Sequence, residues 1–234
     1  HYRAILASEK MIDDIIKEET KDIKKKYADE RRTEIAGKAE DIEIEDLIAE
    51  EDMAITISSD GYIKRLAVSS YRKQKRGGKG VSAMTTKEED FVKQLFVASS
   101  KDYLLIFSNE GTVRWLKVYE IPIASRTAKG KNIVNLLSMG KDEQISSIVA
   151  VKEFSEDQFI VMATAKGNVK KTKLSAYSNP RKSGIVGITL EKGDALVGTA
   201  LSNGTYEVLL ATKQGKALRF PEKLLRDMGR GAKG

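Results

Sequence analysis

Glycines recur at a regular interval through most of this chain, and this repeat constrains the fold more than any other feature. Four β-rich runs are each followed by a short turn with a glycine, and these turns are 50, 56 and 48 residues apart, at Gly61, Gly111, Gly167 and Gly215. A second glycine follows 19, 19, 17 and 19 residues later, at Gly80, Gly130, Gly184 and Gly234. Two anchored positions that recur near 50 residues predict a propeller-like array with one small sheet per repeat.

Each repeat also carries the pattern of a β-hairpin. The runs before the turns are rich in β-branched and aromatic residues with a period of two, at 54–58, 103–107, 159–162 and 206–210. The turn glycine supplies the positive φ that tight hairpins require. We therefore expect a mainly β fold, with about three and a half blades in residues 53–234.

The first 52 residues differ from this repeat. Residues 1–33 contain no glycine or proline, and Ile5, Ile12, Ile16 and Ile23 share one face at near-heptad spacing. This pattern predicts a helix that docks on a partner helix or domain. Residues 34–52 are rich in Glu and Asp and are expected to form an acidic linker.

Charge is unevenly spread along the chain. Of the 41 Lys and Arg and 34 Asp and Glu, residues 1–52 hold 10 and 17, a net of −7, which leaves 31 and 17, a net of +14, for residues 53–234. A strongly basic body after an acidic arm favours a polyanionic partner for the body. A merely solvated, soluble surface is the alternative.

A basic strand follows each of the first three turns. Because side chains alternate across a strand, the apolar residue can face the core while the next residue faces outward. This alternation predicts a row of exposed cations, Lys64, Arg114 and Lys170, which Leu218 interrupts in the fourth repeat. The full set of strand candidates for binding DNA is Lys64, Arg65, Arg114, Lys170, Lys171 and Arg219.

A second set of cations precedes each second glycine. Copies two and three carry Arg126, Lys129, Arg181 and Lys182, and copy four carries Arg230 and Lys233. A curved row of cations matches duplex phosphates, which are bound without sequence specificity through counterion release. Cations that keep exposed strand edges soluble are the competing interpretation.

One basic turn occurs only in the first copy. It places three cations and three glycines in seven residues, Gln74, Lys75, Arg76, Gly77, Gly78, Lys79 and Gly80. Its backbone can approach a phosphate closely. It is not a Walker A loop, because the required spacing is absent and Val81 follows Gly80.

This turn resembles the glycine-rich box of the A subunits of bacterial DNA gyrase, whose common form is Q-R-R-G-G-K-G. The departure is Lys75 for Arg, which keeps the charge but loses the bidentate fork. The stretch Asp60 to Arg65 resembles the first-blade hairpin of that family, and 170–175 and 184–188 resemble later blades. Residues 2–6 and 27–35 look like the last helix before the family's C-terminal domain.

The resemblance implies a six-bladed β-pinwheel that wraps duplex DNA chirally and supports ATP-dependent negative supercoiling. The implied partners are double-stranded DNA, the B subunit of gyrase, and a second A subunit in an A2B2 holoenzyme, in the bacterial cytoplasm at the nucleoid. Residues 1–33 would end the upstream cleavage and coiled-coil region. No cofactor is expected on this fragment, since ATP and Mg²⁺ belong to other parts of the holoenzyme.

No active site can be assembled from the residue inventory. The chain has no cysteine and one histidine, His1, so metal sites built on Cys or His are excluded. It has no apolar run near the roughly 20 residues that span a bilayer, so no membrane contact is expected. Two other functions stay open: the C-terminal domain of topoisomerase IV, which lacks an intact box, and a propeller scaffold that binds proteins.

Overall fold

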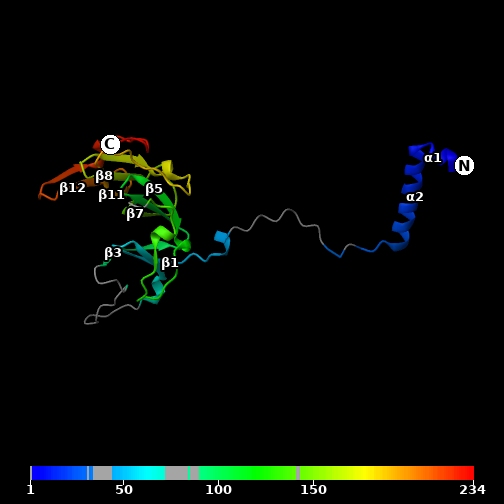
Figure 1. Ribbon diagram of the computed structural model, residues 1–234, viewed down its shortest axis with the longest axis horizontal. Coiled ribbons are helices and arrows are strands. Elements are labelled where there is room, and N and C mark those ends of the chain that lie inside the picture. The colour runs from blue at the N-terminus through cyan, green and yellow to red at the C-terminus, as the bar shows by residue number, and fades with distance from the viewer. Residues whose placement is uncertain (1, 31, 34–43, 72–83, 85–89, 141–142) are drawn as a thin grey trace. The chain divides into compact units, whose positions relative to one another are not determined.

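The computed structural model describes residues 2–30, 32–33, 44–71, 84, 90–140 and 143–234. These residues belong to two compact units, 1–42 and 43–234, which are treated separately below (Figure 1). The basic turn 74–80 lies outside the described residues.

The first unit contains two helices rather than the one that the sequence predicts. Helix α1 spans Tyr2–Leu6 and α2 spans Glu9–Tyr27. The break falls at Ser8, whose side chain accepts a hydrogen bond from the backbone N of Met11 at 3.4 Å. A serine in this capping position satisfies a free N–H at the start of a new helix. Neither helix buries a residue, so the apolar stripe, including Ile16 and Ile23, is uncovered within this unit.

The second unit begins with a short 3₁₀ helix, η1 (Ile44–Leu47), and continues as four antiparallel sheets. The strand order of the first sheet is β3 (Val92–Ser99), β1 (Asp52–Ser58), β2 (Tyr62–Ala67), β6 (Lys131–Asn132). That of the second is β10 (Ile185–Val186), β5 (Thr112–Lys117), β4 (Tyr103–Ser108), β7 (Ile145–Val151). The third is β11 (Leu196–Ser202), β8 (Phe159–Thr164), β9 (Val169–Lys173), and the fourth pairs β12 (Glu207–Ala211) with β13 (Ala217–Pro221).

Short 3₁₀ helices follow the hairpins. They are η2 (Val68–Ser70), η3 (Val118–Glu120), η5 (Leu174–Tyr177) and η6 (Glu222–Leu224), and η4 (Ile133–Asn135) follows β6. The mainly β fold with one sheet per repeat is therefore confirmed. Among the described residues, no helix is long and apolar enough to cross a bilayer.

Two short strands pair with the sheet of the preceding repeat. Strand β6 comes after the hairpin of the second repeat but pairs with β2 of the first, where Tyr62 lies opposite Asn132. Strand β10 of the third repeat pairs with β5 of the second in the same way. Each of these repeats therefore lends its short strand to the sheet before it, which the glycine pattern alone does not predict.

The four turns share one geometry. Their glycines have φ of +81°, +78°, +89° and +80°, as predicted, at Gly61, Gly111, Gly167 and Gly215. In every copy a hydroxyl three residues before the glycine accepts a hydrogen bond from the backbone N of the residue after it, at 3.2 Å. The hydroxyls belong to Ser58, Ser108, Thr164 and Thr212.

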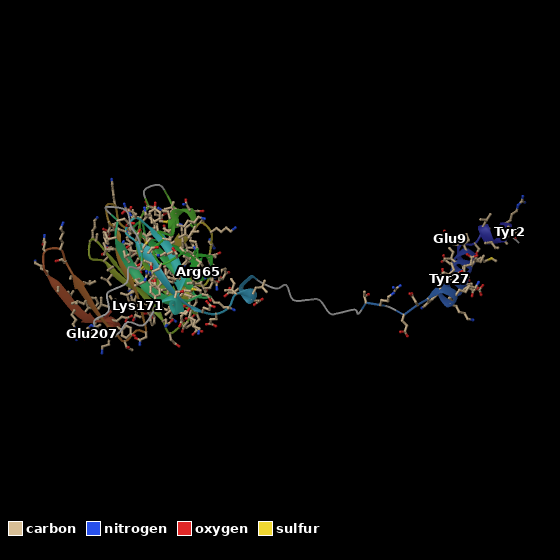
Figure 2. All side chains as sticks on the ribbon, turned by 90° about the horizontal axis from the view of Figure 1, so that it is seen from below. Tyr2, Glu9, Tyr27, Arg65, Lys171 and Glu207 are labelled. Carbon is tan, nitrogen blue, oxygen red and sulfur yellow. The ribbon has the colours of Figure 1, made fainter. Side chains whose placement is uncertain are left out.

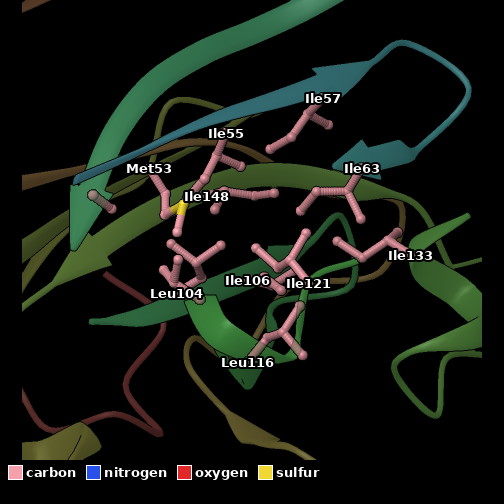
Figure 3. Packing of buried hydrophobic residues seen from close by; sticks show 12 residues of the cluster. Met53, Ile55, Ile57, Ile63, Leu104, Ile106, Leu116, Ile121, Ile133 and Ile148 are labelled. Carbon is pink, nitrogen blue, oxygen red and sulfur yellow. The ribbon is translucent and has the colours of Figure 1, made fainter. Parts of the chain in front are cut away.

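The core consists of two apolar clusters, one on each face of the second sheet. Leu104 and Ile106 of β4 belong to the first cluster, with Ile55 and Ile63 of the first sheet (Figure 3). Leu105 and Phe107 belong to the second, which includes residues of the third sheet. Successive strand residues point to opposite faces, so the unbroken apolar run of β4 belongs to a sheet buried on both sides.

The last strands of the first three repeats line one cavity. This cavity has a volume of about 590 Å³ and is lined by residues 93–97 of β3, 148–150 of β7 and 199–201 of β11. Strand β6 lies at the opposite edge of the first sheet, and β10 lies at the opposite edge of the second. The loops before Gly130 and Gly184 therefore lie next to these edge strands, at the sheet edges opposite to the strands that line this cavity.

Candidate nucleic-acid interface

The three cations predicted to form an exposed row are buried. Lys64 and Lys170 have exposed fractions of 0%, and Arg114 has 8%. The prediction that they face outward is wrong, because chain from the following repeat covers β2 and β9, and Arg114 turns toward Glu143. A strand residue faces solvent only where no further element packs on it, and the sequence period does not reveal that element.

Lys64 holds a loop of the following repeat. Its Nζ donates hydrogen bonds to the carbonyl oxygens of Ser125, Arg126 and Ala128 at 3.0, 2.5 and 2.9 Å. Three carbonyls match the three donors of an ammonium group, which offsets part of the cost of burying its charge. Burial still lowers the pKa of Lys64 from its ordinary value.

Lys170 repeats this arrangement two repeats later. Its Nζ donates to the carbonyl oxygens of Gly229, Arg230 and Ala232 at 3.0, 2.6 and 3.3 Å. Burial, together with the nearby charge of Arg230, lowers the pKa of Lys170 to about 8. Both buried lysines therefore join consecutive repeats through backbone carbonyls.

Arg114 stands at the same place in the second repeat but binds within that repeat. Its Nη1 lies 2.5 Å from Oε1 of Glu143, and its Nε donates to the carbonyl of Ser138 at 2.8 Å. Burial raises the pKa of Glu143, but hydrogen bonds from Arg114, the Gly140 backbone and Ser108 outweigh it, so the net shift is downward. Arg114 is therefore paired and buried inside the protein and is not free to bind a ligand.

The remaining strand cations also have partners in the protein. Arg65 donates to the carbonyls of Ile121 and Tyr119 at 2.6 and 3.0 Å, and Lys171 pairs with Asp227 at 2.9 Å. Arg219 is exposed and pairs with Glu207. Figure 2 shows Glu207 on the fourth sheet. The structure thus places the six strand cations on protein acceptors, and it does not bring them together as one surface.

The loop cations are placed differently. We call residues 125–130, 179–184 and 229–234 the second-glycine loops. Arg126, Lys129, Arg181, Lys182 and Lys233 are exposed and Arg230 is half-buried, and none of them forms an ion pair with another described residue. Unpaired, exposed cations on loops beside the edge strands remain available to a polyanion.

The second glycines are required by close backbone contacts. Gly130 and Gly184 have φ of +79° and +78°, and a Cβ on Gly130 would collide with the carbonyl oxygen of Ile63. The same Cβ would lie 2.9 Å from the side chain of Lys64. Gly130 and Gly184 therefore let their loops pass against the preceding hairpin. Within the described residues, no group of three or more His, Cys, Asp or Glu side chains is placed to hold a metal ion.

Comparisons with known proteins give one consistent family. A family model described as DNA gyrase C-terminal domain, beta-propeller, matches residues 52–99, 102–152, 158–203 and 206–234. The DNA gyrase A subunit of Clostridium acetobutylicum is 47% identical over 99% of this chain, and the alignment covers 28% of that protein. The chain thus spans little more than a quarter of that relative's length.

Solved structures agree on the fold. The C-terminal domain of DNA topoisomerase IV matches with a TM-score of 0.68 and 31% identity, over 80% of this chain and 57% of the other. A DNA gyrase A C-terminal domain matches with a TM-score of 0.63 and 27% identity, over 79% and 59%. The four family-model segments coincide with the four sequence repeats, and together they cover most of the chain. The chain therefore belongs to the DNA gyrase C-terminal domain family of β-propellers.

Proposed function

We propose that residues 53–234 bind duplex DNA without sequence specificity and wrap it chirally, as part of a DNA gyrase that supercoils DNA negatively with ATP. The observation that carries this proposal is the set of exposed, unpaired cations on the second-glycine loops of a gyrase-family propeller. Each phosphate that these cations neutralise contributes about −0.9 to the salt slope, which is the slope of the logarithm of the binding constant against the logarithm of the salt concentration. Bending 20–30 base pairs costs on the order of 1–6 kcal/mol, so several contacts along an arc are needed.

The proposal also covers the partners of the intact protein, and membership of the gyrase family supports it. In this proposal the chain is the C-terminal part of a gyrase A protein, two copies of which assemble with two B subunits on double-stranded DNA. The holoenzyme acts in the bacterial cytoplasm at the nucleoid. ATP and Mg²⁺ are bound by other parts of it, and this fragment carries no active site.

The test is to ligate a nicked DNA circle in the presence of increasing amounts of the chain. We expect a shift of the linking-number distribution toward positive values, because a chiral wrap is trapped on ligation. Replacing Gln74 to Gly80 by a neutral linker of equal length should abolish the shift while leaving the fold intact. No shift despite measured DNA binding would contradict wrapping by this chain.

A topoisomerase IV domain is the second candidate, since such a domain gives the higher TM-score of the two structures. It predicts DNA binding that does not depend on residues 74–80. A linking-number shift that survives replacement of the box would therefore favour topoisomerase IV over gyrase. A propeller that binds proteins instead predicts weak DNA binding and no linking-number shift.

A further inference from the structure

A cleft between the third and fourth repeats brings two arginines together. It has a volume of about 430 Å³ and is lined by Arg181, Gly184, Ile185, Val186, Arg230 and Gly231. The lining contains no acidic side chain, and neither arginine forms an ion pair with another described residue. Two guanidinium groups without counter-charges at one cleft favour an anion that accepts hydrogen bonds from both.

Lys170 fixes the position of one of these arginines. Its ammonium holds the carbonyls of Gly229, Arg230 and Ala232, so the backbone on both sides of Arg230 is anchored from inside the protein. Thr189, which is also in the third repeat, anchors the same loop, because its Oγ1 donates to the carbonyl of Gly231 at 2.8 Å. The carbonyl oxygens of residues 229–232 are thereby paired with donors of the protein.

The two charged side chains that line the cleft and the buried ammonium of Lys170 all carry positive charge. The buried ammonium of Lys170 lies close enough to Arg230 for the two charges to repel, and this repulsion contributes to the lowered pKa of Lys170. Lys170 has no carboxylate partner among the described residues. An anion in the cleft would therefore interact favourably with three cations, two of them directly.

We propose that Lys170 is a positioning residue, which holds the 229–232 backbone so that Arg230 and Arg181 together bind one phosphate group of the DNA backbone. This inference rests on the proposed function and deepens it. It assigns Arg181 and Arg230 a shared contact and gives the buried lysine a role through the loop rather than a contact with DNA.

The cleft is tested with paired surface variants of the full chain, by measuring DNA affinity as a function of salt concentration. Because the two arginines share one phosphate, Arg181→Ala and Arg230→Ala should each reduce the salt slope, the change of log K with log salt concentration, by up to about 0.9, and the double variant should reduce it by about 0.9 in total. Arg226→Ala removes the same charge from an exposed position outside both the cleft lining and the second-glycine loops. Its effect should be half as large or less, and an equal effect would overturn the cleft.

The role of Lys170 is tested by a double-mutant cycle with Arg230. In the Lys170→Met background, Arg230→Ala should have no further effect on the salt slope, because Arg230 is no longer held in place. Lys64→Met is the matched control, since Lys64 makes the same three-carbonyl arrangement at another loop. In that background Arg230→Ala should keep its full effect; a full effect in the Lys170→Met background would contradict the positioning role.

Two further comparisons keep the inference separable from the proposed function. If Lys170→Met does not fold, Lys170→Gln, which keeps a shorter side-chain donor, takes its place in the cycle. If the unmodified chain fails to bind duplex DNA, the proposed function fails. If it binds but Arg181→Ala and Arg226→Ala behave alike, only the cleft fails.

Discussion

The junctions between repeats use the same strand position in two different ways. Between repeats one and two, and again between three and four, a buried lysine reaches across to three carbonyls of the following repeat. Between repeats two and three the equivalent residue is Arg114, which stays inside its own repeat and pairs with Glu143. At this junction a side-chain hydrogen bond between the repeats comes from Trp115, whose indole N–H donates to the carbonyl of Tyr177 at 2.9 Å.

This difference shows that a recurring cation in a repeat protein need not face its ligand. The ammonium group has three donors on a flexible stem and suits a ring of carbonyls, whereas the planar guanidinium suits a carboxylate. The same charge pattern therefore stabilises the junctions, while the loops that the lysines hold carry the exposed cations. Four sets of amino-acid substitutions test this difference between the junctions.

The largest effect is expected from Arg114→Met. It leaves the carboxylate of Glu143 buried without its counter-charge, which costs about 3 kcal/mol or more in the free energy of unfolding. Urea denaturation followed by circular dichroism measures this loss. The double variant Arg114→Met, Glu143→Met should recover much of it, and a double variant as unstable as the single one would contradict a self-contained ion pair.

Lys64→Met is expected to cost about 2 kcal/mol, because each carbonyl that it leaves without its partner carries a desolvation penalty of about 1–3 kcal/mol if it stays buried. Part of that penalty is avoided, since Ser125 also accepts from the backbone N of Ala128 at 3.1 Å. The same urea experiment measures the change. Lys152→Met, at an exposed lysine, is the control and should change stability by less than about 0.5 kcal/mol.

The glycines of the two sets should differ in their tolerance of alanine. Gly167 meets no atom within 4 Å of an added Cβ, so Gly167→Ala costs only the strain of its φ of +89°, about 1 kcal/mol. Gly130→Ala adds a collision with the carbonyl of Ile63 and should cost more than that. Thermal denaturation of the two variants compares them, and equal losses would show that the junction relaxes freely.

The smallest effect concerns acid pH. Because the pKa of Glu143 is lowered in the folded protein, its contribution to stability is present above the ordinary pKa of a glutamate. It is lost as the pH falls through the lowered value. Glu143→Gln should therefore show a shallower fall in stability toward acid pH than the unmodified chain. An identical fall in both would assign the acid sensitivity to other carboxylates, such as Asp90 and Asp194.

Much of the fold is predictable from local chemistry. The turn glycines and the two-residue period of the strands give the sheets and their number, because positive φ and hairpin formation depend on neighbouring residues. The pairing of β6 and β10 with the sheets of the preceding repeats is not predictable in this way. Both strands are only two residues long, so neither leaves a periodic signal, and their partners lie about 70 residues away.

The candidate site was half predictable for the same reason. Loops before the second glycines have no strand alternation to interpret, and their cations are exposed or half-buried, as the sequence suggests. On the strands, alternation predicted Lys64 and Lys170 outward, but the loops of the next repeat cover them. The recurrence of a lysine together with the loop that follows about 60 residues later was the one available signal of their contact.

The division of the cations into two sets is tested most directly by the salt dependence of DNA binding. One variant replaces the loop residues Arg126, Lys129, Arg181 and Arg230 by alanine, and the other replaces the paired strand residues Lys171 and Arg219. The first should lower the salt slope by about 2.7, which is three phosphate contacts of about 0.9 each, because Arg181 and Arg230 share one phosphate. The second should leave it unchanged. A slope that falls with the strand variant and persists in the loop variant would contradict the account.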